Sequence, residues 1–410
     1  MNPAYVDRGL LQLTVTAGSG VSPVAGARVR LTDPADGRVL EELVTDSSGQ
    51  TPAVELPAPP LEFSVAGGGE RPYAAYNATV TAPGFATLHL GGVQVLPQSM
   101  AIQPAALGRS TPGGFNVSNI SIAPHTLWGD FPPKLPEDEV KPLPDPGGLV
   151  VLPEPVIPEF IVVHLGRPED DSAANQWVRF KDYIKNVASS EIYSTWRTEA
   201  IKANVLAIIS FTLNRVFTEW YRGKGYDFTV TNSTAFDQSF VSGRTIYQEI
   251  SVVVDDLFST YVTRPNIVQP LLTQYCDGKR VQCNGLSQWG SQSLAEQGWD
   301  AVSILKNYYG ADIFLTSAQE VEGVPLSYGG QVLQPGSAGE AVRTIQSQLN
   351  RISGSFPAIP KVAVDGVYGQ QTQAAVRTFQ QIFHLPQTGS VDFATWYRIS
   401  NVFVAVADLA

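Results

Sequence analysis

The first hundred residues alternate apolar and polar side chains with the two-residue period of β-strands. Residues 11–16 read Leu-Gln-Leu-Thr-Val-Thr, and residues 28–31 repeat the alternation directly after the turn residues at 23–26. Residues 45–50, Thr-Asp-Ser-Ser-Gly-Gln, combine a strand end with a tight turn. Short alternating strands separated by turn residues are typical of β-sandwiches. We therefore predict an N-terminal β-sandwich over residues 1–105.

Prolines cluster in the next part of the chain, residues 106–157, and most densely in 131–148. Proline lacks an N–H donor and fixes φ, so this stretch cannot be a helix or a central strand. We expect an extended, partly polyproline-like connector. It is either a plain spacer or a processing region where a protease separates the front of the chain from the middle, because exposed linker backbone is easily cut.

The apolar period changes to that of helices between residues 158 and 325. A helix is predicted over residues 196–221, where one apolar stripe recurs at steps of three or four: Ile201, Val205, Ile208, Thr212, Val216 and Trp220. Further helices are expected over 247–262, 291–297 and 299–309. With the short strands between them, these helices indicate a central mixed α+β domain.

The last part, residues 330–405, predicts a small three-helix domain. Amphipathic patterns cover 338–352 and 371–383, and a third helix begins near Phe393. The fold class is therefore multidomain: an N-terminal β-sandwich, a central mixed α+β domain and a C-terminal small three-helix domain.

The formal net charge of -11 over 410 residues excludes two classes of partner. Nucleic acid and anionic membrane surfaces both require clustered Lys and Arg. Polysaccharide, which is held by hydrogen bonds and aromatic faces, is compatible with this charge. We also expect no membrane-spanning helix, because no stretch approaches 18 uninterrupted apolar residues, and no standard signal peptide at the N-terminus.

Only two cysteines are present, Cys276 and Cys283, and the four histidines lie far from them in the sequence. Two cysteines cannot complete a zinc site without other ligands. A local disulfide, two free thiols and a metal site all stay open at this point.

The C-terminal segment contains three pieces in order: residues 333–349, Val-Asp-Gly-Val-Tyr-Gly at 364–369, and Thr395 with Trp396. Their order gives a resemblance to the three-helix peptidoglycan-binding domain. It implies a shallow groove for wall peptide or glycan, with Asp365, Tyr368 and Thr372 as candidate binding residues. The same three residues could equally serve the turn and the cap of the following helix.

The middle contains Tyr-Ile-Lys-Asn-Val-Ala-Ser-Ser-Glu-Ile at residues 183–192 and Trp-Arg-Thr-Glu-Ala-Ile-Lys-Ala at residues 196–203. The first is similar to "YLxGVVxxEM" and the second to "WxxEALKA" of the SpoIID family of lytic enzymes, which cleave the glycan strands of peptidoglycan. Residues 285–298 match "GMSQYGAQxMAxxG". The order of all parts is similar to the clostridial spore cortex-lytic enzymes of the SleC type, whose front domain is a transthyretin-like or carboxypeptidase-regulatory-like sandwich.

These resemblances imply a lytic transglycosylase that cleaves spore cortex peptidoglycan during germination. They also imply a zymogen, with an activating germination protease as partner, and a location in the cortex and coat region of the spore. Two other functions stay open, an N-acetylmuramoyl-L-alanine amidase and a non-catalytic wall-binding protein. The scarcity of histidine disfavours the amidase, which usually needs zinc.

Glu191 is the candidate proton donor, because cleavage of a glycosidic bond needs a carboxylic acid of raised pKa. The resemblance aligns it with the family's catalytic glutamate, and the neighbouring Val187, Ile192 and Tyr193 could desolvate it. The muramic 6-hydroxyl then attacks and closes a 1,6-anhydro ring. Lys202, which matches a family lysine, is a second catalytic candidate or a solvent-facing helix lysine.

Ser287, Gln288 and Trp289 are candidate substrate-binding residues, by hydrogen bonds and by stacking. The alternative places Trp289 in the core and Gln288 at a helix cap. The chain departs from the family in two places. It lacks the arginine of "AARTY", for which Arg215 is a candidate substitute, and it lacks the histidine of "GHGVGMSQ". We therefore expect no metal and no cofactor.

Overall fold

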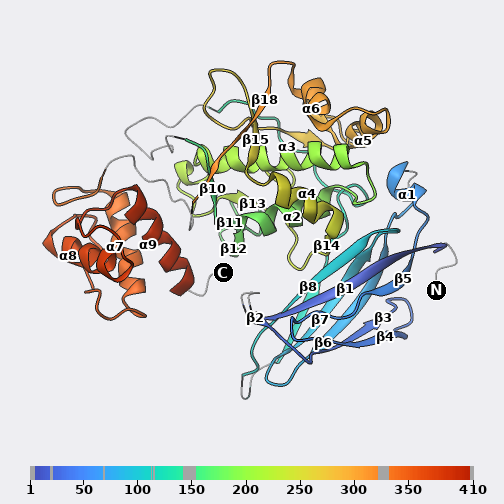
Figure 1. Ribbon diagram of the computed structural model, residues 1–410, viewed down its shortest axis with the longest axis horizontal. Helices are drawn as coiled ribbons and strands as arrows, with labels where there is room; N and C mark the ends of the chain where they lie inside the picture. Colours follow the sequence, from blue (N-terminus) through green and yellow to red (C-terminus); the bar gives the residue numbers. More distant parts are fainter. Residues whose placement is uncertain are drawn as a thin grey trace.

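The computed structural model describes residues 5–18, 22–67, 70–111, 113, 116–141, 154–321 and 332–406. Figure 1 shows a sheet-rich front, a central body built around a long helix, and a separate helical unit at the C-terminal end. This arrangement confirms the prediction of a multidomain chain with a sheet-rich N-terminal region.

Two five-stranded sheets form the front domain. The first has the order β14-β8-β1-β2, with β5 paired to β1: β1 (Asp7–Ala17), β2 (Ser22–Pro23), β5 (Val54–Ala58), β8 (Met100–Leu107) and β14 (Ile246–Tyr247). The second has the order β4-β3-β6-β7-β9: β3 (Arg28–Thr32), β4 (Val39–Val44), β6 (Ala74–Thr81), β7 (Thr87–Val95) and β9 (Val117–Ser121). The short helix α1 (Glu62–Val65) follows β5.

Alternation explains how these sheets pack. Leu11, Leu13 and Val15 of β1 are fully buried, as are Ala78 and Val80 of β6, and all belong to one hydrophobic cluster. Because side chains of a strand point alternately to its two faces, one face of each sheet enters the core. Each buried leucine or valine side chain of this kind contributes about 1.5–3 kcal/mol by leaving water.

The front domain exceeds the predicted limit at residue 105 in two ways. Strand β9 lies beyond it and pairs in parallel with β7. Strand β14 comes from the middle of the chain and pairs with β8, with Ile246 opposite Ile102. Residues 116–141 also differ from a free spacer, since Ile122, Leu127 and Lys141 are buried. Front and middle are therefore tied together by strand pairing as well as by the connector.

The central body consists of helices and short strands around α3. Its helices are α2 (Phe180–Glu191), α3 (Thr198–Phe217), α4 (Gln248–Leu257), α5 (Gln288–Glu296) and α6 (Ala301–Tyr309), with the 3₁₀ turn η1 (Arg222–Lys224). Its strands are β10 (Val156–Pro158), β11 (Phe160–His164), β12 (Asn175–Arg179), β13 (Val230–Thr231), β15 (Thr260–Thr263), β16 (Tyr275–Cys276), β17 (Leu286–Ser287), β18 (Phe314–Ser317) and β19 (Gln319–Val321).

Helix α3 is buried on every side, not only along the predicted stripe. It is long and apolar enough to cross a membrane, with a mean hydropathy of 1.3, but 94% of its apolar window is covered by the protein. Helices α2, α4, α5 and α6 surround it (Figure 1). These properties fit the core helix of a globular domain.

The helix predicted over 247–262 is shorter in the structure. Helix α4 ends at Leu257, and residues 260–263, Thr-Tyr-Val-Thr, form β15 and pair with β18. β-Branched and aromatic side chains favour the extended pairing over a continued helix. The sequence pattern alone did not reveal this partner strand.

Three helices form the C-terminal domain: α7 (Glu340–Ile352), α8 (Gln370–Ile382) and α9 (Phe393–Val406). Their apolar faces meet in a separate core that includes Val342, Ile345, Leu349, Phe379 and Trp396. The predicted three-helix domain is confirmed.

Candidate functional site

Glu191 is the last residue of α2, and it lies on the face of that helix that is buried in the protein core. Phe180, Ile184 and Val187 precede it at steps of four and three, and all are buried. Side chains at this spacing lie on one face of a helix. Glu191 continues the apolar stripe, and its residue is only 3% exposed. The helix stops at Ile192, whose backbone is extended.

Both carboxylate oxygens of Glu191 accept a hydrogen bond. The backbone N–H of Ser239 donates to Oε1 at 2.6 Å, and the phenol of Tyr275 donates to Oε2 at 2.5 Å. Tyr275 is itself held by the Nε2 of Gln238 at 3.1 Å. The Nε2 of Gln288 donates to the backbone carbonyl of Glu191 at 3.0 Å. The carboxyl group is therefore fixed in one orientation.

Burial raises the pKa of Glu191 above its usual value of 4.5. The cation of Lys134 and the hydrogen bonds from Tyr275 and Ser239 oppose this, because each favours the ionised form, but they do not cancel it. Burial also raises the pKa of Tyr275 well above 10.0, so its phenol keeps the proton that it donates. A carboxyl group in this setting is suited to hold and release a proton.

Glu191 faces a cavity of about 160 Å³. Three of its lining residues come from the body of the middle domain, namely Glu191, Tyr275 and Gln288. Thr234 comes from the loop after β13. The others come from the segment that follows Tyr275 and from the connector: Cys276, Asp277, Arg280, Val281, Thr126, Gly129, Asp130, Phe131, Pro132, Pro133 and Lys134. The site is therefore closed on one side by a segment that the sequence predicted as a spacer.

The two cysteines form a disulfide that closes the loop beside this cavity, with a sulfur–sulfur distance of 2.15 Å. Inside the loop, Asp277 accepts backbone N–H bonds from Lys279, Arg280 and Val281. No group of three metal-ligating side chains occurs among the residues that the structure describes.

The other candidates of the middle domain lie in different surroundings. Lys202 forms an ion pair with Glu199 at 2.8 Å near the start of α3, and it does not line the cavity. The hydroxyl of Ser287 caps α5 by accepting from the N–H of Gly290. The cap is thus Ser287 and not Gln288, which lines the cavity.

Trp289 packs against other aromatic rings. Its ring lies 5.1 Å from that of Trp196 and 6.0 Å from that of Tyr193, and the ammonium of Lys279 covers it at 3.9 Å. These contacts leave Trp289 in a structural position and not on the cavity wall.

In the C-terminal domain the three candidate binding residues, Asp365, Tyr368 and Thr372, lie in different surroundings. Asp365 and Thr372 line a surface hollow together with Gln346, whose amide donates to both of them at 2.9 and 3.1 Å. Tyr368 is 1% exposed, and its phenol donates to the carbonyl of Gly389 at 3.0 Å. Tyr368 therefore belongs to the core. Asp365 is exposed at the hollow, whereas Thr372 lies at its buried edge and is 3% exposed.

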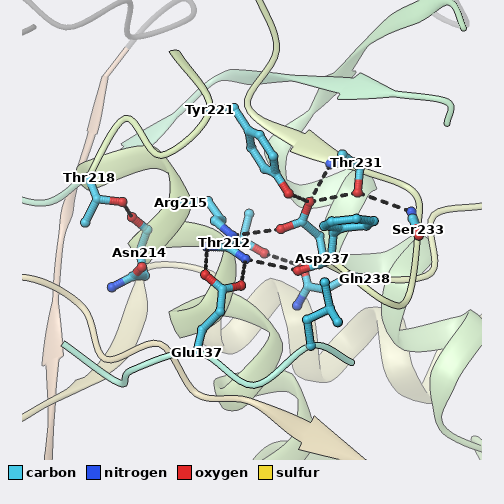
Figure 2. A network of polar contacts seen from close by, with 12 residues as sticks. Glu137, Thr212, Asn214, Arg215, Thr218, Tyr221, Thr231, Ser233, Asp237 and Gln238 are labelled. Atoms are coloured by element: carbon cyan, nitrogen blue, oxygen red, sulfur yellow. Dashed lines mark hydrogen bonds and ion pairs between the residues drawn. The ribbon is translucent and has the colours of Figure 1, made fainter. Parts of the chain in front are cut away.

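Arg215 is the centre of a buried network that the sequence did not predict (Figure 2). Its Nε donates to Asp237 at 2.7 Å, and its two terminal nitrogens donate to Glu137 of the connector at 3.0 and 2.5 Å. Asp237 also accepts from the phenol of Tyr221 at 2.7 Å and from the backbone and hydroxyl of Thr231 at 2.8 Å. The charged Arg215 within the apolar sequence of α3 was the sequence signal, while Asp237 stands among polar residues.

Two segments of the chain match known families. One contains Glu191, and the other is the C-terminal three-helix domain. Residues 169–256 match SpoIID, described as Stage II sporulation protein. Residues 338–399 match the peptidoglycan binding domain family PG_binding_1. A comparison with curated proteins found no match.

Several solved structures are similar to parts of the chain. The SleB N-terminal domain is 32% identical, over 19% of this chain and 99% of that chain, with a TM-score of 0.17. The Bacillus anthracis TIE protein is 11% identical, over 25% of this chain and 17% of that chain, with a TM-score of 0.18. Catechol 1,2-dioxygenase from Acinetobacter sp. ADP1 is 16% identical, over 28% of this chain and 57% of that chain, with a TM-score of 0.19. At these TM-scores the similarities carry no argument about function.

The two family matches fit the order of domains in the structure. The SpoIID match includes α2, α3 and Ser239, whose backbone N–H donates to Glu191. The peptidoglycan-binding match spans α7 and α8 and the start of α9. The chain thus contains a segment similar to the SpoIID family and a C-terminal segment similar to the peptidoglycan-binding domain, and these similarities support a peptidoglycan-degrading role linked to sporulation.

Proposed function

We propose that the protein is a lytic transglycosylase that cleaves the glycan strands of spore cortex peptidoglycan during germination. It is made as a zymogen and activated by a germination protease that cuts the connector. The observation that carries the proposal is Glu191, a buried carboxyl group of raised pKa whose two oxygens are oriented and which faces a cavity.

The chemistry follows from the surroundings of that group. Glu191 gives its proton to the glycosidic oxygen as the bond to the muramic C1 breaks. The muramic 6-hydroxyl attacks C1, and the resulting carboxylate of Glu191 takes the hydroxyl proton, so the acid is regenerated. Tyr275 and the N–H of Ser239 stabilise the carboxylate in between, because both donate to it. No water enters the reaction, and the product carries a 1,6-anhydro ring.

Substrate binding is assigned to two places. Gln288 lines the cavity beside Glu191 and can donate to sugar oxygens. Asp365 and Thr372 of the C-terminal domain can hold wall peptide or glycan and keep the enzyme on its polymer. Lys202 pairs with Glu199 and does not line the cavity of Glu191, so the proposed proton transfer assigns it no role.

The test is Glu191→Gln, compared with the wild type on purified cortex before and after limited proteolysis of the connector. Glu249→Gln is the matched control, because Glu249 is also a carboxyl group whose pKa burial raises, but it accepts from Met100 and lies outside the cavity. We expect mass spectrometry to find anhydro-ended fragments from the wild type and the control only. Full activity of the Glu191→Gln protein would remove Glu191 from the mechanism, and free stem peptides would indicate an amidase.

A further inference from the structure

The connector residues 131–141, here called the proline segment, lie along the middle domain and line two neighbouring cavities. Its first part, Phe131 to Lys134, closes the cavity of Glu191. Its second part, including Leu135, Glu137 and Lys141, lines another cavity of about 610 Å³ that also contains Trp220 and Tyr221. The segment therefore covers one continuous stretch of the surface that begins at the proposed acid.

Lys134 occupies the space beside Glu191. Its ammonium group donates to the backbone carbonyl of Asp237 and lies 4.8 Å from the ring of Phe211 and 5.1 Å from the ring of Tyr275. The cavity that remains, about 160 Å³, is well below the roughly 300–1,000 Å³ of sites that hold small ligands. A glycan strand cannot reach Glu191 while this side chain is in place.

Glu137 fixes the second part of the segment on Arg215. The two side chains form a bidentate pair at 3.0 and 2.5 Å (Figure 2), the geometry with which arginine binds free carboxylates. The ammonium of Lys141 lies 2.6 Å from Glu137 and 4.4 Å from the ring of Trp220. Removal of the segment would expose one edge of the guanidinium and one face of this indole.

The backbone of the segment is bound in the way that a peptide ligand is bound. The amide of Gln274 accepts from the N–H of Glu137 at 3.1 Å and donates to the carbonyl of Leu135 at 2.7 Å. The amide of Gln269 makes the same pair of bonds with the backbone of Lys141, both at 2.9 Å. Polar contacts of this kind can be exchanged for water or substrate without opening the core.

A short stretch of chain connects Arg215 with Glu191, although the buried Arg215 lines neither cavity while the segment is in place. Asp237 pairs with Arg215, and Ser239, two residues later, donates its N–H to Glu191. Two residues of extended chain span at most about 7 Å. Once the proline segment has left, a polymer that presents a glycosidic oxygen to Glu191 would therefore bring its next substituents near Arg215.

We propose that the proline segment is an internal ligand of the glycan groove, and that Glu137 occupies at Arg215 the place of a carboxylate carried by the wall polymer. This inference rests on the proposed function, because it identifies the groove as a glycan site. It assigns to Arg215 the recognition of an acidic substituent, such as the carboxyl groups of muramic acid and its stem peptide. It also makes departure of the segment the step that opens the enzyme.

The test is a binding measurement in the full-length chain with Glu191→Gln, so that no turnover takes place. Glu137→Ala is compared with Asp138→Ala, which removes an exposed carboxylate of the same segment that does not contact Arg215. The probe is a soluble muramic disaccharide-peptide, used with free and with amidated carboxyl groups and followed by calorimetry. We expect Glu137→Ala to strengthen binding of the free probe at least about tenfold, since the apparent affinity rises with the fraction of open groove.

The control variant should bind within about twofold of its parent, and the amidated probe should lose most of the gain. Gln274→Ala, which removes two of the hydrogen bonds that hold the backbone of the segment and leaves Arg215 unchanged, should strengthen binding in the same direction. Equal affinity in the variants and the parent would overturn the proposal, and an equal gain for the amidated probe would overturn the role of Arg215. Because this readout needs no catalysis, it can succeed or fail independently of the Glu191 experiment.

Discussion

Tyr275→Phe is the most direct test of how Glu191 keeps its proton. The phenol donates to Oε2 at 2.5 Å, and this bond favours the ionised carboxylate. A hydrogen bond to a charged group is worth about 1.5–3 kcal/mol. Since 1.36 kcal/mol corresponds to one pH unit of titration, its loss should move the titration midpoint of Glu191 upward by about 1 to 2 pH units. Gln238 keeps the carbonyl of Ile208 as a partner at 3.1 Å, so the change should stay local.

The assay is carbon NMR of protein labelled at the glutamate carboxyl groups, with the Glu191 signal assigned by its loss in Glu191→Gln. Tyr183→Phe is the matched control, because Tyr183 donates to the same Gln238 at 3.0 Å but not to Glu191. In the activated enzyme, the basic limb of the pH–rate profile should move in the same direction as the titration. An unchanged or lower midpoint in Tyr275→Phe, or an equal rise in the control, would refute the reasoning.

Two further predictions concern the buried network around Arg215. Asp237→Asn should lower the free energy of unfolding by about 3–5 kcal/mol in urea denaturation, because it leaves part of a fully buried charge pair uncompensated. The control Asp255→Asn breaks the exposed pair with Lys185 and should lower it by about 1 kcal/mol or less. Equal losses in the two variants would contradict the argument. Burial raises the pKa of Glu137, but Arg215 and Lys141 lower it by more, so the net pKa is below its usual 4.5. The stability that Glu137 adds is then complete above pH 4.5 and lost as the pH falls through its folded pKa. The difference in unfolding free energy between wild type and Glu137→Gln should therefore be constant near neutral pH and shrink in acid, and a difference that grows in acid would contradict the pairing.

The sequence by itself determined the elements whose stability is local. Alternation of apolar residues gave the sheet-rich front, and helical periodicity gave α3 and the three C-terminal helices, because each pattern presents one apolar face that must be buried. Glu191 came from the resemblance of residues 183–192 to the SpoIID family, and the helix that carries it was not predicted. The resemblance of residues 183–192 to SpoIID gave the chemistry that this position implies.

Only the tertiary structure decided what surrounds that carboxyl group. Tyr275, Ser239 and Gln238 are 84, 48 and 47 positions away from Glu191 in the sequence, and nothing local to any of them reveals the partner. The same holds for Glu137, which looked like one charge in a proline-rich spacer and is paired with a buried arginine 78 residues away. Periodicity records which face of an element avoids water, but it does not record which distant polar group meets it. The connector is therefore seen as part of the site only once the chain has folded.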